Sequence, residues 1–182
     1  LLGLDVANAS MYDGASALAE AVLMARRLRP GRKDVLVSRG VHPHYREAIA
    51  TYVQGLPDVC LREIPLGADG RTDGQALGGM LGDEALCVVA GYPNVLGIVE
   101  DLAQLATAAH GVGALMLSAT PEPLALAYLR SPGGSAVDIA VAEGQGFGLP
   151  VSFGGPGVGL FATRDAHVRA MPGRIVGETV DS

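Results

Sequence analysis

Short apolar runs alternate with helical segments along this chain. The clearest runs are Asp34–Ser38 (DVLVS), Ala85–Ala90 (ALCVVA), Ala114–Leu117 and Val137–Val141, and about ten to fifteen residues of helical character separate most of them. Strands connected through helices form right-handed βαβ units, so the pattern predicts an α/β fold with a mainly parallel sheet. Because the runs are apolar almost throughout, we expect helices on both faces of that sheet.

The remaining elements are predicted from helical periodicity and from start and stop residues. Helices are expected at Ala15–Leu28, His44–Gln54, Gly74–Leu81, Ile98–His110 and Glu122–Tyr128, and further strands at Val59–Ile64 and Val158–Ala162. Ser10 or Asp13 is the candidate cap of the first helix. Ile98–His110 has the most regular apolar face, and Glu100 and Asp101 would lie in its first turn, where acidic side chains favour the helix dipole.

Composition limits the class of protein. At 182 residues, with 49% apolar residues and a mean hydropathy of +0.32, the chain suits one globular α/β domain spanning 1–182. No apolar stretch approaches the length of a membrane span, so a membrane protein is not expected. The net charge of −6 argues against a nucleic-acid surface.

The cysteines and the chain ends add context. Cys60 and Cys87 lie in apolar, strand-like runs, so both are expected to be buried free thiols of a cytoplasmic protein. The chain begins at Leu1 without a signal pattern and ends at 178–182 without a closing element, so we expect both ends to be cuts within a longer protein.

Several motifs have a structural explanation. Residues 157–162 (GVGLFA) fit the dinucleotide fingerprint GxGxxA, but they enter a predicted strand and not a helix, which disfavours a nicotinamide site. His42 and His44 lack further ligands nearby, so no metal site is expected. Ser152 lacks the glycine spacing of a nucleophile elbow.

Residues 8–15 (NASMYDGA) are more suggestive. Small residues before a helix N-terminus can form an anion cradle, because free backbone amides point outward there. The same pattern also serves simply to start a helix, and the residues alone do not separate the two alternatives.

A set of ordered motifs resembles one family throughout the chain. The motifs are NASMYDGASALAEA, SRGVHPHYREAI, YPNVLGIVEDL, AHGVGAL, GQGFGLPVSFGGPGVGLFA and MPGRIVG. They resemble subunit 1 of glycine dehydrogenase (decarboxylating), the P-protein of the glycine cleavage system. The resemblance implies the large domain of fold-type I pyridoxal-phosphate transferases, which are aspartate-aminotransferase-like, and this agrees with the alternating pattern.

In this family two related halves assemble, and one of them holds pyridoxal phosphate on a lysine. Its motif LHKTFxxPHGGGGPG, laid over residues 143–157, places Gln145 where the lysine belongs. An amide nitrogen cannot form the Schiff base. The same comparison places Ser118 where the other half has an acid for the pyridine nitrogen, and replaces a histidine by Leu96. The only lysine of the chain, Lys33, precedes a strand, at the end opposite to the usual ligand side.

The resemblance therefore implies a partner subunit with no catalytic residue of its own. It implies that subunit 2 holds pyridoxal phosphate, that glycine is decarboxylated there and that lipoylated H-protein accepts the aminomethyl group, so the chain alone should be inactive. Candidate site-facing or interface residues at predicted strand exits are Asn8, Ser10, Asp13, His42, Tyr92 and Asn94. The alternatives are a self-sufficient pyridoxal-phosphate enzyme and a nucleotide-binding oxidoreductase domain.

Overall fold

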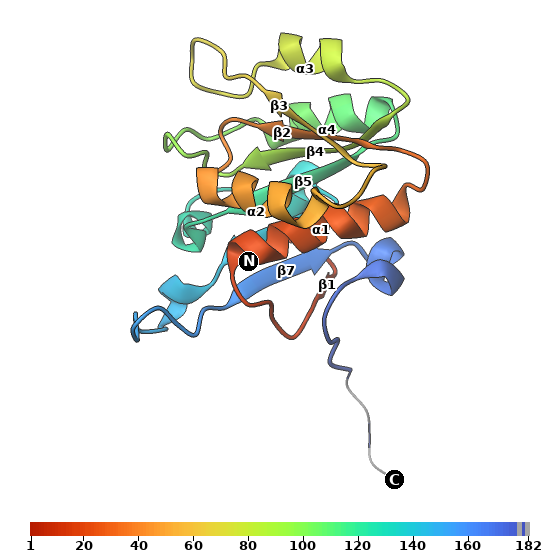
Figure 1. Cartoon of the computed structure of the whole chain (residues 1–182). Coiled ribbons are helices and arrows are strands. Elements are labelled where there is room, and N and C mark those ends of the chain that lie inside the picture. The colour runs from red at the N-terminus through yellow and green to blue at the C-terminus, as the bar shows by residue number, and fades with distance from the viewer. Residues whose placement is uncertain (178–179, 181–182) are drawn as a thin grey trace.

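The computed structural model describes residues 1–177 and 180, and within them one twisted sheet forms the centre of the molecule (Figure 1). Its seven strands lie in the order β1-β7-β6-β5-β4-β2-β3. The strands are β1 (Val6–Ala7), β2 (Asp34–Ser38), β3 (Cys60–Ile64), β4 (Ala85–Gly91), β5 (Leu115–Thr120), β6 (Ile139–Glu143) and β7 (Gly159–Thr163). Five of them are parallel, while β7 runs antiparallel to β6 and to β1. The expected α/β fold is confirmed.

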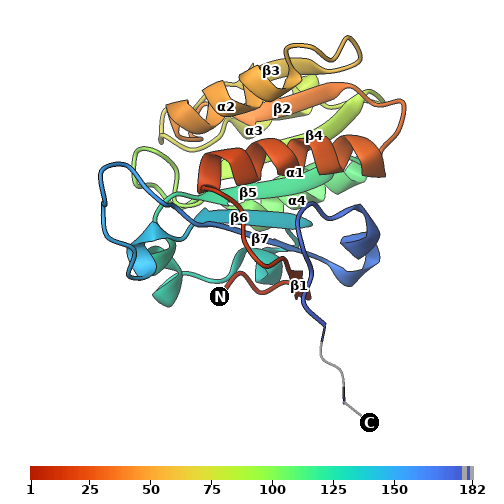
Figure 2. The same ribbon diagram turned by 60° about the horizontal axis from the view of Figure 1, so that its bottom comes forward.

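Helices cover both faces of the sheet (Figure 2). They are α1 (Gly14–Leu28), α2 (Pro43–Val53), α3 (Gly74–Met80) and α4 (Leu102–Gly111). One core cluster packs α1 and α2 against the sheet, and the other packs α3 and α4 against the opposite face. Strands β4 and β5 lie in the middle and are buried throughout, which explains their uninterrupted apolar sequences.

Short 3-10 helices occupy several connections. They are η1 (Pro123–Ala127), η2 (Pro132–Ser135), η3 (Gln145–Phe147) and η4 (Asp165–Ala170). The predicted helix Glu122–Tyr128 is η1, a 3-10 helix that follows Glu122 as its cap. The short strand β1 and the helices η2, η3 and η4 were not expected.

Two sequence expectations are wrong. Helix α4 begins at Leu102 and not at Ile98, because Glu100 turns inward to bind the loop before the helix and Asp101 caps it. Cys60 is exposed, since β3 is an edge strand of the sheet. Cys87 is buried as expected, and burial raises the pKa of its thiol to about 12.

Among the described residues, no helix combines the length and apolarity that a membrane crossing requires. Of the C-terminal residues 178–182, which are expected to mark a cut, only Val180 falls within the part of the chain that the structure describes.

Candidate functional site

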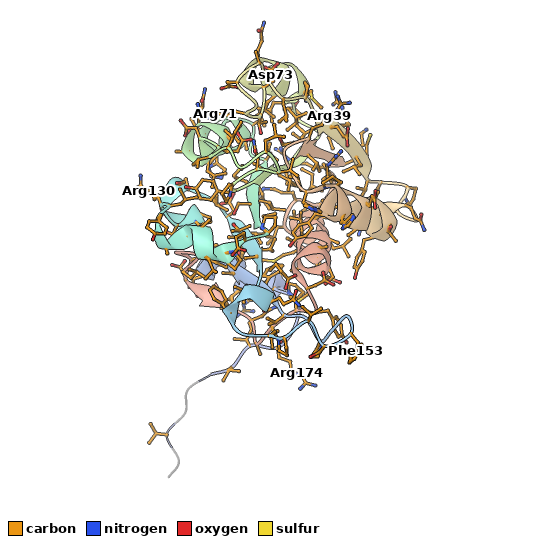
Figure 3. The ribbon with its side chains drawn as sticks, turned by 90° about the vertical axis from the view of Figure 1, so that its left-hand side faces the viewer. Arg39, Arg71, Asp73, Arg130, Phe153 and Arg174 are labelled. Carbon is orange, nitrogen blue, oxygen red and sulfur yellow. The ribbon has the colours of Figure 1, made fainter. Side chains whose placement is uncertain are left out.

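The carboxyl ends of the five parallel strands meet at one edge of the sheet, and Figure 3 looks onto this edge. Ligands of open α/β sheets bind at such an edge. A pocket of about 290 Å³ lies here on the side of α1 and α2. It is lined by Asp13, Ala15, His42, His44, Tyr45, Pro121, Glu143 and Gln145. The structure thus brings together three residues singled out from the sequence, Asp13, His42 and Gln145.

Two glycines of β7 and its preceding loop bring Asp13 to this edge. Backbone hydrogen bonds join Met11 to Gly159 in both directions, at 2.9 and 2.8 Å. A Cβ atom at Gly159 would lie 2.3 Å from the carbonyl oxygen of Asp13, and one at Gly157 would lie 2.8 Å from that of Tyr12. These glycines of the GxGxxA pattern therefore permit a close backbone crossing. As expected from the sequence, they lead into a strand and do not open a helix.

Helix α1 begins with a reciprocal cap. The Asp13 carboxylate accepts a hydrogen bond from the backbone N–H of Ser16 at 2.7 Å, and the Ser16 hydroxyl accepts one from the N–H of Asp13 at 3.3 Å. This capping box satisfies donors that a helix start otherwise leaves free. Residues 8–15 could form an anion cradle or simply start a helix, and the observed geometry is that of a helix start.

Glu143, the last residue of β6, completes the same corner of the pocket. One carboxylate oxygen accepts a hydrogen bond from the N–H of Gly14 at 2.8 Å, and the other accepts one from the N–H of Gln145 at 3.1 Å. Sequence reasoning missed Glu143. Its position two residues after the predicted strand Val137–Val141 was the available signal.

Tyr45 closes the floor of the pocket under these carboxylates. Its side chain is buried, and burial, followed by the negative charges of Glu143 and Asp13, raises the pKa of its hydroxyl. These surroundings therefore favour the neutral hydroxyl of Tyr45. Beside it, His42 caps α2, because its Nδ1 accepts a hydrogen bond from the N–H of His44 at 3.3 Å. The described residues contain no group of three or more His, Cys, Asp or Glu side chains placed to hold a metal ion.

The other candidate residues lie elsewhere. Asn8 donates to the sulfur of Met11 and to the carbonyl oxygen of Pro172, and Ser10 is exposed on a groove beside β1 and β7. Tyr92 belongs to the core cluster on the α4 side of the sheet. None of these residues lines the pocket that contains Gln145.

Asn94 belongs to a buried polar cluster on the α3 and α4 side, which the sequence analysis did not anticipate. Glu100 accepts hydrogen bonds from the N–H and hydroxyl of Thr72 and from the amide of Asn94, at 3.0 to 3.1 Å. The Thr72 hydroxyl also pairs with that of Ser38 at 2.7 Å. The cluster ties the loops after β3 and β4 together. We call it the Glu100 cluster.

Pyridoxal phosphate, the cofactor that the family resemblance implies, would need an amine for its Schiff base in this pocket. Gln145 offers no amine there, and Lys33 pairs with Glu84 before β4, at the opposite edge. Side chains alternate along β5, so Ser118 lies with Met116 toward α4 and is not brought into the pocket. Ala119, which faces α1, cannot bind a pyridine nitrogen. The residues present do not fit the cofactor.

Comparisons with known proteins agree with the sequence resemblance. Residues 1–182 match the family described as glycine cleavage system P-protein. The chain is 52% identical to a probable glycine dehydrogenase (decarboxylating) subunit 1 from Sorangium cellulosum and 52% identical to one from Anaeromyxobacter dehalogenans. It is covered completely in both cases but spans only 40% of the length of each relative.

Solved structures show the same fold. An inhibitor-bound glycine decarboxylase (P-protein) of the glycine cleavage system superposes with a TM-score of 0.90 at 50% identity, over 99% of this chain and 39% of that one. The cysteine desulfurase CsdA from Escherichia coli matches with a TM-score of 0.73 at 18% identity, over 89% of this chain and 39% of that one, which concerns the fold alone. These matches confirm the expected fold-type I large domain. The chain belongs to the glycine cleavage system P-protein family.

Proposed function

We propose that this chain is part of the partner subunit of a glycine dehydrogenase (decarboxylating) that does not carry the Schiff-base lysine. The observation that carries the proposal is Gln145, which lines the pocket at the carboxyl edge of the sheet. An amide there cannot hold pyridoxal phosphate covalently. The cofactor then belongs to the lysine-bearing partner subunit, where its ring supplies the electron sink for glycine decarboxylation.

An apolar rim beside the pocket supports a role in assembly. We define the rim as Tyr12, Phe147, Leu149, Val151 and Phe153, whose side chains are all exposed. Pocket and rim meet directly, since Tyr12 and Val151 line a second hollow together with Gln145 and Glu143. Contiguous exposed apolar side chains mark interaction surfaces. The rim is a surface that a partner subunit would cover.

The backbone of the rim loop adds to this argument. Ser152 and Phe153 have φ angles of 38° and 57°, a left-handed conformation that is costly for residues other than glycine. Phe153 projects away from the body of the molecule in Figure 3. Strained, outward-facing aromatic side chains favour a binding role. We propose that the loop 147–153 contacts the lysine-bearing subunit in a cytoplasmic hetero-oligomer, and that lipoylated H-protein docks on that assembly.

Reconstitution tests the proposal. Full-length protein containing this chain, the lysine-bearing subunit and lipoylated H-protein are combined with glycine, and carbon dioxide release is measured. Activity is expected only when both subunits are present, because each lacks part of the site. Glycine decarboxylation by this subunit without its partner contradicts the proposal.

A pair of aromatic substitutions tests the surface. Phe153→Asp should weaken subunit association by about tenfold or more, since it places a charge in a desolvated contact. Tyr52→Asp, on α2 and also exposed, is the matched control and should leave association unchanged. Association is measured by analytical ultracentrifugation. If both substitutions weakened association equally, the rim would not be part of the interface.

A further inference from the structure

The first turn of α1 is occupied by carboxylates of the chain itself. The N–H of Gly14 binds Glu143 and the N–H of Ser16 binds Asp13. A helix N-terminus with free amides attracts phosphate and carboxylate ligands, because the amides and the helix dipole both favour negative charge. Here two of the amides that would meet such a ligand already have anionic partners.

Glu143 holds its place through both oxygens. It comes from the end of β6, 129 residues after Gly14, and it bridges α1 to the N–H of Gln145 in η3. The surroundings are tightly packed, since a Cβ atom at Gly14 would lie only 2.1 Å from the Tyr45 hydroxyl oxygen. A carboxylate that accepts a hydrogen bond through each of its oxygens is held in place by the fold.

The electrostatics of the corner agree with this geometry. Asp13 and Glu143 line the same pocket, and both raise the pKa of Tyr45 in addition to the effect of burial. A phosphate group that approached Gly14 would meet two carboxylates in a partly desolvated corner. Like charges at short range repel one another, and partial burial weakens the screening by water.

We infer that Glu143 is an internal anion that fills the ligand position at the N-terminus of α1 and thereby excludes phosphate-bearing molecules from this pocket. This exclusion is separate from the absence of an amine at Gln145. The inference goes beyond the proposed function, which concerns assembly with the lysine-bearing subunit and does not depend on the exclusion of phosphate. A lysine at position 145 alone would therefore not create a cofactor site in this chain.

Phosphate titration of the full-length protein tests the inference. Inorganic phosphate and, separately, pyridoxal phosphate are titrated while the Gly14 amide resonance and the binding heat are followed. The wild-type protein should show no saturable change at Gly14. Glu143→Ala should show a saturable change, with a midpoint at least about tenfold below the highest phosphate concentration at which the wild type shows none.

Two variants complete the test. Glu143→Gln keeps an acceptor for the Gly14 amide but removes the charge, so it should bind phosphate between wild type and Glu143→Ala, and it serves if the alanine variant does not fold. Glu84→Gln removes an exposed carboxylate at the opposite edge of the sheet and should behave as wild type. Saturable phosphate binding at Gly14 in the wild type overturns the inference, and so does a folded Glu143→Ala protein that binds none. Neither result bears on the reconstituted decarboxylation assay, so the two proposals fail separately.

Discussion

Two carboxylates at the same edge of the sheet have different surroundings. Glu143 ends β6 on the α1 side, is half-buried beside an open pocket and binds two backbone amides. Glu100 precedes α4 on the other side, is 5% exposed and binds three donor groups of Thr72 and Asn94. The first restricts what a pocket can bind, and the second holds two loops in place. The same residue type thus serves ligand exclusion or loop architecture according to its burial.

The largest effect is expected from removing the Glu100 carboxylate. Glu100→Ala leaves the buried N–H of Thr72 without its acceptor and removes one of the two acceptors of the Asn94 amide. It should therefore lower the free energy of unfolding by about 3 kcal/mol. Chemical denaturation of the full-length protein measures the change. Glu84→Ala removes an exposed carboxylate with a surface partner and should cost under about 1 kcal/mol. Similar costs at both positions would show that the Glu100 cluster is not a stability element.

Replacing each carboxylate by its amide sharpens the comparison. Glu100→Gln turns an NH₂ group toward the N–H of Thr72 in a buried space, and we expect a loss of about 2 kcal/mol. Glu143→Gln meets the same difficulty with Gly14 or Gln145, but in a half-buried corner where water can compensate, so about 1 kcal/mol is expected. The difference between the two midpoints of unfolding is the informative quantity. A larger loss at Glu143 would reverse the assignment of the two roles.

The two helix caps provide a reference, because the stability lost when a cap is removed should be similar in both regions. Asp13 caps α1 beside the pocket, and Asp101 caps α4 beside the Glu100 cluster. Alanine at either position removes one side-chain acceptor and should destabilise the protein by about 1 kcal/mol, whereas asparagine should cost less. Thermal unfolding of the four variants checks this. Strongly unequal alanine effects would mean that a cap also serves its neighbouring site.

The smallest effect concerns the ionisation of Tyr45. Because burial and then Glu143 and Asp13 raise its pKa in the folded protein, the neutral ring is favoured by folding. The resulting stability is present below about pH 10, where an unfolded tyrosine is neutral, and is lost as the pH rises above that value. Ultraviolet titration of tyrosinate should show a late-ionising group. Glu143→Gln should move its midpoint down, while Glu100→Gln should not; equal shifts would contradict the local assignment.

The sequence predicted the sheet well because burial on both faces produces uninterrupted apolar runs. β4 and β5 are central, and their residues read as strands without ambiguity. Periodicity was misleading at Ile98, whose apolar side chain fits the face of α4 although its segment is a loop bound by Asn94. Cys60 shows the same limit, since an apolar run does not reveal that β3 lies at the edge.

The candidate site was only partly predictable for a different reason. Asp13, His42 and Gln145 stand in motifs that resemble a family, so they could be named from the sequence. Each of the two carboxylates has one partner that is distant in the sequence: Gly14 lies 129 residues from Glu143, and Thr72 lies 28 residues from Glu100. Such pairs arise from the topology of the sheet and the loops around it. No local pattern reports them.

The central claim is that the cofactor of the assembled enzyme is not held by this chain. The complex of both subunits is loaded with pyridoxal phosphate, reduced with borohydride and digested, and the modified peptide is identified by mass spectrometry. The account predicts that the label lies on a lysine of the other, lysine-bearing subunit and on no residue of this chain. A reduced pyridoxyl group on any residue between Leu1 and Ser182 would contradict it.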